Sequence, residues 1–338
     1  MATGRRGIFL AAFWVLVASC ANGHGDASID LDELNPRILE ADRGGFPGIS
    51  WATGESVLVV VQPDELRPGE QVLPWRLDIE GGPLQALPAP TGVSCERPDL
   101  LFPQAIGDGH IALLEDCKPE RRVVAFDVET GSLAELADTD DGTTGFAWDP
   151  DAAGGIASIG SRVCQGLGWI GKLGSGPLDV SVDGRMAAGD DVSRETENCS
   201  DLGRADTPAL QVGGQGYAFF ASPDSIGRSG QARLRAAWNL YVARLGDAEA
   251  TRILTGVNSP GDLDWSPDGQ KLAFAGEFGD LGRGGWVVDV ATGSVRRFTS
   301  IPLDDVAFSP DGSMVAAIET GPLQFPPQSR ILIFDLRG

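Results

Sequence analysis

The sequence predicts an all-β fold built from repeated units of four antiparallel strands, and three observations predict it. A hairpin turn of the type Ser-Pro-Asp-Gly recurs along the chain. Short apolar segments flank its copies, as expected where a turn joins two half-buried strands. A second type of hairpin alternates with the first. Four-stranded units that repeat in this way are typical of a β-propeller, whose sheets stand radially around a central channel.

The first hairpin is most regular near the C-terminus. Residues 263–269 and 306–312 each place an apolar or aromatic residue before Ser-Pro-Asp-Gly, and the two turns lie 43 residues apart. Proline presets the backbone for the turn, aspartate can accept hydrogen bonds from nearby amides, and glycine adopts the left-handed conformation. The spacing is that of a propeller blade and not of a helical repeat. Weaker copies occur at residues 49–54, 106–109, 146–151 and 209–214.

The second hairpin completes each unit. Its clearest copies are residues 77–82, 126–131 and 288–293, and looser copies are residues 169–174 and 242–247. Each unit therefore reads strand a, turn, strand b, loop, strand c, turn, strand d, and we count six such units. The last unit lacks its own strand d, and residues 36–40 resemble that strand. We expect this N-terminal strand to close the ring, which hides sheet edges that would otherwise invite aggregation.

One segment leaves a seven-bladed ring open as the alternative. Residues 178–184 also resemble the first hairpin. The chain between this segment and the next unit is too short for four further strands. We therefore interpret residues 177–182 as strand d of the third blade and residues 183–205 as an insertion.

The N-terminus predicts export. Arg5 and Arg6 precede an apolar run over residues 7–19, which is the pattern of a secretory signal and too short to span a bilayer. The run ends in Val-Ala-Ser-Cys, which resembles the bacterial lipobox and implies lipidation of Cys20; ordinary cleavage with an incidental Cys20 is the alternative. We therefore expect a lipoprotein signal peptide over residues 1–19, a polar tether over residues 20–35 and a propeller domain over residues 36–338.

A family resemblance rests on the two regular turns. Residues 265–269 and 308–312 resemble the repeat of the WD-like, TolB-type six-bladed propellers. The resemblance implies a six-bladed propeller on the extracytoplasmic side of the membrane. It implies no single activity, because propellers host scaffolds, lyases and lactonases. The helical domain that precedes the propeller of the Tol-system protein has no counterpart here, so we do not expect a Tol-system role.

The charge balance restricts the classes of partner that the protein is expected to bind. The chain has 48 acidic and 26 basic residues and a net charge of −22. Such a surface repels nucleic acid and anionic lipid head groups. We therefore expect contact with the membrane through the lipid anchor only, no nucleic acid, a monomer, and an envelope or secreted protein as the partner.

Four cysteines follow the one in the lipobox-like segment: Cys95, Cys117, Cys164 and Cys199. An even number in an exported protein favours disulfides. Cys95 precedes strand a of the second unit and Cys117 follows its strand b, so antiparallel pairing brings the two together. Cys164 follows strand b of the third unit and Cys199 lies in the insertion beside it. We predict Cys95–Cys117 and Cys164–Cys199, with a structural role worth roughly 3 kcal/mol each.

The longest loops indicate which face of the ring binds a partner. The repeated turns lie on one face, and the longer connections lie on the other, at residues 62–71, 222–237, 277–285 and 319–330. Binding residues concentrate on long loops over a rigid frame. The loop of the fourth unit and the tryptophan beside it provide candidate partner-binding residues of types that are favoured at interfaces: Arg228, Arg233, Arg235 and Trp238. The alternative is that this loop is only solvated.

Acidic residues recur at or just before strand a of several units: Asp99, Asp141, Asp206, Asp262, Asp264, Asp304 and Asp305. Because strands a line the channel, these carboxylates would ring its mouth. Oxygen ligands of this kind suit Ca²⁺. The alternative is a set of turn and capping aspartates on an acidic surface, since no ligand spacing here is specific.

The sequence points to no catalytic residue. His110 is the only histidine after the signal and tether, which excludes a site with two histidine ligands. The first hypothesis is a non-enzymatic lipoprotein that binds a protein or an envelope polymer as a scaffold, with no cofactor. The alternative is a cation-dependent hydrolase, lactonase or lyase with its site at the mouth of the channel and with Ca²⁺ as the cation.

Overall fold

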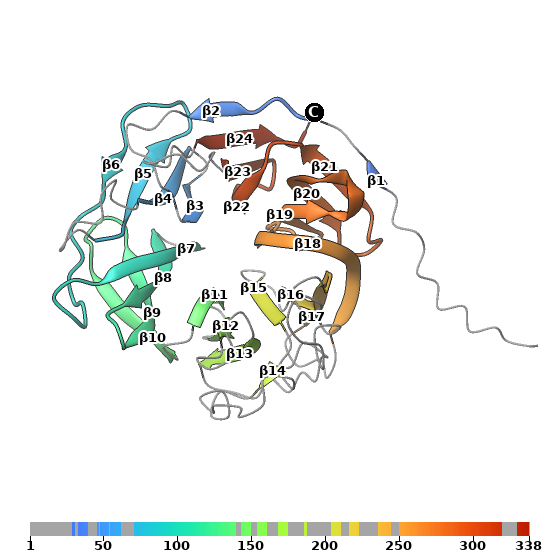
Figure 1. Ribbon diagram of the computed structural model, residues 1–338. Coiled ribbons are helices and arrows are strands. Elements are labelled where there is room, and N and C mark those ends of the chain that lie inside the picture. The colour runs from blue at the N-terminus through green and yellow to red at the C-terminus, as the bar shows by residue number, and fades with distance from the viewer. Residues whose placement is uncertain are drawn as a thin grey trace, which may run out of the picture.

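The strands of the protein stand radially around a central channel in a computed structural model (Figure 1). The structure describes residues 29–30, 33–39, 46, 48–53, 55–61, 71–107, 109–139, 143–149, 154–160, 168–174, 186–187, 204–210, 216–222, 236–244, 250–319 and 330–337. Within these residues the secondary structure is β apart from the 3₁₀ helix η4 (Gly279–Leu281). This part of the chain holds no helix with the length and hydrophobicity needed to traverse a bilayer.

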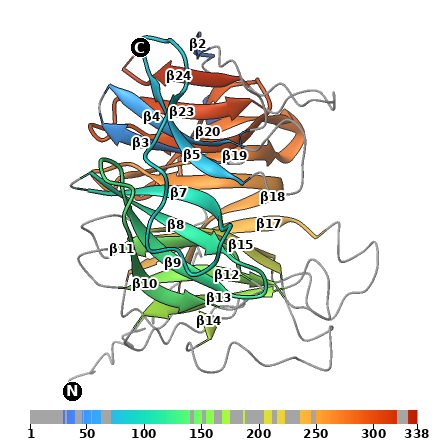
Figure 2. The same ribbon diagram turned by 90° about the vertical axis from the view of Figure 1, so that its left-hand side faces the viewer.

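Four of the sheets have four strands each. The first contains β3 (Gly48–Thr53), β4 (Ser56–Val61), β5 (Leu73–Asp78) and β6 (Gln85–Ala86). The second, nearest the viewer in Figure 2, contains β7 (Asp99–Gly107), β8 (His110–Asp116), β9 (Arg121–Asp127) and β10 (Leu133–Thr139). The third contains β11 (Thr143–Asp149), β12 (Gly154–Gly160), β13 (Gly168–Gly174) and β14 (Met186–Ala187). The sheet formed by the final strands of the chain, here called the last sheet, contains β22 (Leu303–Phe308), β23 (Met314–Glu319), β24 (Ile331–Asp335) and β2 (Arg37–Leu39).

A fifth sheet has eight strands. It contains β15 (Arg204–Leu210), β16 (Gly216–Ser222), β17 (Trp238–Arg244), β18 (Thr251–Trp265), β19 (Lys271–Phe278), β20 (Arg283–Asp289), β21 (Val295–Thr299) and β1 (Ile29–Asp30). Its 15-residue strand β18 pairs with β17 through its first half and with β19 through its second half. The strand therefore serves as strand d of one unit and strand a of the next. The count of six blades stays a prediction, in which this sheet contributes two.

The N-terminal strand closes the ring as predicted. β2 pairs in antiparallel fashion with β24, and Arg37 lies opposite Ile333. Figure 1 shows β2 outside β24, at the rim of the last sheet. Leu39 is buried there in a cluster that also contains Ile331 and Ile333, so the strand contributes to the core as well as to the hydrogen bonding.

Two outer strands differ from the prediction. Ile29 and Asp30 of the expected tether pair in parallel with β21, so the propeller contacts this segment from residue 29. The expected strand d of the third sheet, at residues 177–182, lies outside the described residues. The outer partner of β13 is β14, which falls inside the expected insertion and runs parallel. Both differences occur at outer edges, where unpaired backbone groups accept any extended segment nearby.

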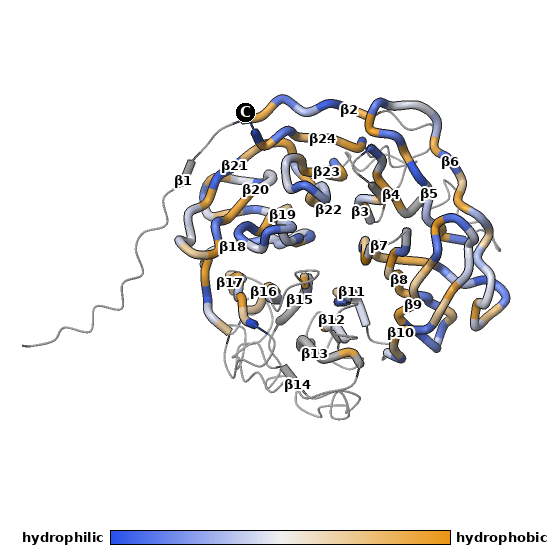
Figure 3. The backbone as a smooth tube through the Cα atoms, turned by 180° about the vertical axis from the view of Figure 1, so that it is seen from behind, coloured by the Kyte–Doolittle hydropathy of each residue, from blue (hydrophilic) through white to orange (hydrophobic). Residues whose placement is uncertain are grey.

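The core lies between neighbouring sheets. Hydrophobic clusters combine residues of adjacent sheets, for example Trp51 of the first sheet with Ile318 of the last. The indole N–H of Trp51 donates to the carbonyl of Ala307 at 2.9 Å, and that of Trp265 donates to Ala209 at 3.3 Å. Figure 3 shows hydrophobic stretches along the strands and hydrophilic residues at many turns. The repeated tryptophans therefore belong to the inter-sheet core, as expected from their repeat positions.

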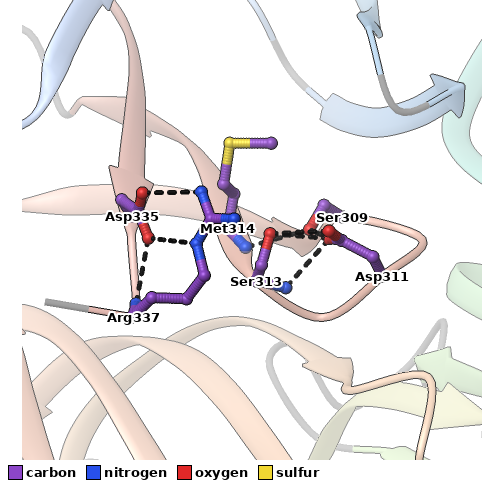
Figure 4. Close-up of polar contacts among 6 residues, drawn as sticks. All are labelled: Ser309, Asp311, Ser313, Met314, Asp335 and Arg337. Atoms are coloured by element: carbon purple, nitrogen blue, oxygen red, sulfur yellow. Dashed lines mark hydrogen bonds and ion pairs between the residues drawn. The ribbon is translucent and has the colours of Figure 1, made fainter.

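The Ser-Pro-Asp-Gly turn has the predicted chemistry (Figure 4). The Ser309 hydroxyl donates to Asp311 Oδ1 at 2.7 Å and accepts from the backbone N–H of Met314 at 2.9 Å. Ser313 donates to the same carboxylate through its N–H and its hydroxyl. Gly312 has a φ of 70°, the left-handed conformation that glycine adopts without steric cost. The turn is thus stabilised locally.

Candidate functional site: the central cavity

A cavity of about 880 Å³ lies on the central channel. The innermost strands of all the predicted units line it: β3, β7, β11, β15, β18 and β22. These strands face one another across the axis of the ring (Figure 1), so residues that are far apart in the sequence meet there. This is the position at which a propeller can enclose a ligand within its ring.

The wall of this cavity is divided into an acidic and an apolar side. The acidic wall, on β18 and β22, consists of Asp262, Asp264, Asp304 and Asp305. The wall on and beside the four other inner strands is mainly apolar and is called the apolar wall. It includes Phe46, Phe102, Pro103, Phe146 and Pro208, with the polar residues Ser50 and Gln104 among them. The two walls offer different chemistry to a ligand that contacts both.

Two carboxylates of the acidic wall also join neighbouring sheets. Asp305 Oδ2 accepts a hydrogen bond of 2.9 Å from the backbone N–H of Ile49 in the first sheet. Asp264 Oδ2 accepts one of 2.7 Å from the N–H of Phe308 in the last sheet. The strand register shifts shortly before both aspartates, between Pro260 and Leu263 and between Leu303 and Asp305. Such bulges re-aim side chains.

Burial changes the protonation of these carboxyls. Burial, opposed by the hydrogen bond from the N–H of Phe308 and helped by the nearby charge of Asp262, raises the pKa of Asp264 to about 7. Burial also raises the pKa of Asp305 well above its usual range, helped by the charge of Asp262 and a hydrogen bond with that carboxyl. The acidic wall therefore carries less negative charge than its number of aspartates implies.

The structure brings together four of the seven aspartates predicted at the channel mouth: Asp262, Asp264, Asp304 and Asp305. Asp99 is not among the cavity-lining residues, because its Oδ1 accepts from the N–H of Val72 at 3.0 Å beside the start of β7. The Asp206 side chain and all of Asp141 lie outside the described residues. Across the described ranges, no three Asp, Glu, His or Cys side chains are placed to hold a metal ion. The described carboxyls thus form one wall and not the expected ring.

Ser50 and Gln104 are channel residues that sequence reasoning missed. Ser50 Oγ accepts from the N–H of Ala105 at 2.9 Å. Gln104 binds both backbone groups of Trp148, accepting at 2.7 Å and donating at 3.0 Å. Ser50, Gln104 and Asp264 occupy equivalent register positions opposite strand b. The available signal was a polar residue within the otherwise apolar strand a, at the position that pairs with the third residue of strand b.

The predicted disulfide between Cys95 and Cys117 is present. Buried ion pairs flank it, between Arg121 and Asp116 at 2.8 Å and between Arg122 and the fully buried Glu115. The disulfide attaches the loop before β7 to the end of β8, and the ion pairs join β8 to β9, which supports a structural role. Cys164 and Cys199 lie outside the described residues, so their pairing stays a prediction.

The predicted partner-binding group has one described member. Arg228, Arg233 and Arg235 lie outside the described residues. Trp238 is only 5% exposed and packs in a core cluster with Phe220 and Val257. Its assignment to a partner surface is wrong, because its side chain is buried in this core cluster and its strand β17 is an interior strand of the sheet. Cys20 also lies outside the described residues.

No protein-family model and no curated protein matches the sequence. TolB from Acinetobacter baumannii matches the structure with a TM-score of 0.55 and 16% identity, over 84% of this chain and 65% of that chain. A luciferin-regenerating enzyme matches with a TM-score of 0.51 and 8% identity, over 89% of this chain and 96% of that chain. This chain therefore spans less than two thirds of the TolB chain. At these identities the likeness shows the fold alone, which is an all-β propeller similar to that of TolB.

Proposed function

We propose that this protein is an exported, lipid-anchored propeller that binds a segment of an envelope or secreted protein in its central cavity, without catalysing a reaction. The signal-like N-terminus with Cys20 supports export and anchoring. The division of the cavity into an acidic and an apolar wall carries the proposal for binding. Large ligand clefts of roughly 300–1,000 Å³ are typical of binding sites, and this cavity falls within that range.

The chemistry of the two walls defines the ligand. A lysine or arginine side chain complements Asp262 and Asp304, while aromatic or aliphatic neighbours complement Phe102 and Pro103. A cavity of about 880 Å³ accommodates several side chains but not a folded domain. The ligand is therefore an extended segment with a basic residue beside apolar ones. The net charge of −22 favours its encounter with a basic partner.

One observation keeps an enzyme as the second candidate. The pKa of Asp264 is raised to about 7, and a carboxyl with a pKa near the working pH suits general acid–base catalysis. A cation-dependent hydrolase, lactonase or lyase would also need a ligand cluster, which the described side chains do not form. Binding therefore has the stronger support.

The test is a pull-down from envelope extract with the purified full chain in detergent, with and without chelator. The variant Asp262→Asn/Asp304→Asn removes charge from the acidic wall, and Asp280→Asn removes one charge from the exposed helix η4 as the control. We expect the wild type and the control to capture the same protein in both buffers and the double variant to lose it. Capture that persists in the double variant contradicts the cavity site. Capture that needs a divalent cation favours the second candidate.

A further inference from the structure

Residues 29–30 and 33–39, here called the N-terminal clasp, contact the fifth sheet first. Ile29 and Asp30 pair with Val295 and Arg296 of β21. The backbone N–H of Leu34 then donates to the carbonyl of Phe298 at 2.8 Å. The clasp therefore follows the outer edge of β21 before it reaches the last sheet, as Figure 1 shows from the positions of β1 and β2.

Glu33 attaches the clasp to a buried cation. Its carboxylate accepts from Arg297 Nη2 and from the Ser300 hydroxyl, both at 3.0 Å. Arg297 is itself held by the carbonyl of Leu281 at 3.0 Å, and its guanidinium lies 5.8 Å from the centre of the Trp286 ring. Because Arg297 is fixed in this way, its pair with Glu33 costs less side-chain entropy than a pair between two free surface chains.

The clasp next crosses to the last and first sheets. β2 pairs with β24, and Leu39 is buried at that edge. Arg37 Nη1 donates to the Ile79 carbonyl and to Glu80 Oε1, both at 3.0 Å, in the turn after β5. One short segment thus contacts the fifth, last and first sheets in succession, and the chain that leaves β2 enters β3 of the first sheet.

The inner side of the same junction holds one carboxyl of the acidic wall, that of Asp305. Asp305 of the last sheet binds the N–H of Ile49 in the first sheet, and Trp51 binds the carbonyl of Ala307. The junction between the last and first sheets is therefore held outside by the clasp and inside by a cavity carboxyl. Loss of the clasp contacts on the outer side would therefore loosen the same two sheets that hold Asp305 in place.

We propose that the N-terminal clasp controls opening of the ring at the junction between the last and first sheets. Release of residues 29–36 from β21 weakens β2 and then the contact between Asp305 and Ile49, so that the cavity opens along its acidic wall. The N-terminal side of the clasp is where the membrane anchor is proposed, so tension on the anchor would act first on this junction. The inference goes beyond the proposed function, because it requires no ligand.

Hydrogen–deuterium exchange of the full chain tests the clasp. Leu34→Pro removes the N–H that binds Phe298, and Leu34→Ala keeps it. Glu33→Ala removes the contact with Arg297, and Glu129→Ala removes an exposed glutamate from the second sheet as its control. In Leu34→Pro and Glu33→Ala we expect amides of β24 and of residues 48–51 to exchange about tenfold faster, as sub-global opening predicts. Amides of β8 and β9 should stay at the wild-type rate.

Two outcomes overturn the proposal. One is unchanged exchange at residues 48–51 in both clasp variants, which would show that the clasp is passive. The other is faster exchange in every sheet, which would show global destabilisation and no opening at one junction. If Leu34→Pro fails to fold, Glu33→Ala with its Glu129→Ala control decides alone. Neither reading depends on the pull-down, so the two proposals can fail separately.

Discussion

Asp264 and Asp268 lie four residues apart in one repeat, yet their environments are opposite. Asp264 faces the cavity, accepts from the N–H of Phe308, and has its pKa raised to about 7, chiefly by burial. Asp268 lies in the following turn, where hydrogen bonds from the Ser266 hydroxyl and the N–H of Gln270 lower its pKa. The same contrast separates the cavity carboxyl Asp305 from the turn carboxyl Asp311, whose pKa falls to about 2.

Position in the repeat, and not residue type, decides whether an aspartate caps a turn or lines the cavity. The turn aspartates are ionised, exposed caps that stabilise a hairpin. The cavity aspartates lose solvent and crowd one another, so a proton or a cation stabilises them.

The largest expected effect concerns pH. The pKa of Asp264 is about 7 in the folded chain and about 3.9 when unfolded. The folded state then binds more protons at Asp264 between these values, so the contribution of this group to stability is fully present below pH 4 and is lost as the pH rises towards 7. We expect Asp264→Asn to flatten this slope by on the order of 1–3 kcal/mol between pH 4 and 7, less than the full shift because the cavity admits solvent. Urea unfolding at several pH values measures it.

Asp268→Asn is the control for the pH slope, because the lowered pKa of Asp268 has the opposite sign. Its stabilising contribution is present above pH 4 and is lost only at lower pH. If the pH dependence of the unfolding free energy between pH 4 and 7 changed equally in both variants, the proposed difference between Asp264 and Asp268 would be wrong.

The next effect concerns the hydrogen bond across the ring junction. Asp305→Ala leaves the N–H of Ile49 without its acceptor, which costs about 1–3 kcal/mol for a buried donor. Asp305→Asn keeps an acceptor oxygen and resembles the protonated acid, so we expect it to cost less than 1 kcal/mol, on the order of a neutral hydrogen bond. Denaturant midpoints at pH 7 distinguish the two, and equal losses would show that charge and not geometry matters at this position.

A smaller effect is expected in the turn. Asp311→Ala removes the acceptor for Ser309 and Ser313 and should cost about 0.5–1.5 kcal/mol, as for a single net hydrogen bond. It should also lose less stability than the wild type when the pH falls from 4 to 2, because the pKa of Asp311 is about 2. Thermal unfolding at the two pH values checks both. If Asp311→Ala lost more stability than Asp305→Ala, the turn aspartate and not the cavity aspartate would contribute more to the fold.

The smallest effect is expected at the C-terminal surface pair. Arg337 binds Asp335 at 2.8 Å, and both side chains are more than half exposed (Figure 4). Exposed ion pairs contribute little because solvent and salt screen them. Arg337→Ala should leave the unfolding midpoint unchanged, and a clear loss at low salt that disappears at high salt would show that this pair is stronger than its exposure implies.

The repeat made much of the fold predictable. Turn chemistry depends on a few adjacent residues, so Ser309 to Gly312 identified a hairpin without tertiary information. The disulfide between Cys95 and Cys117 followed from the strand order of one unit. The prediction for Trp238 failed because it rested on the residue type and on the arginines of the neighbouring loop, whereas the residue begins an interior strand and is buried.

The candidate site was less predictable because its contacts cross sheets. Asp99 and Asp305 both lie at the start of a strand a, but one binds a neighbouring loop and the other the adjacent sheet. Ser50 and Gln104 have no motif of their own, and they became visible only through their bonds to the next inner strand.

The all-β class and the alternating hairpins could be predicted from the sequence, because turn geometry and apolar alternation are local properties. The closing strand could be predicted because the last repeat lacks one strand and residues 36–40 resemble it. The folded chain was needed to show which carboxyls share a cavity wall, which of them have a raised pKa and where the N-terminal clasp attaches. These features depend on burial and on bonds between sheets that are distant in sequence, and no spacing along the chain encodes either.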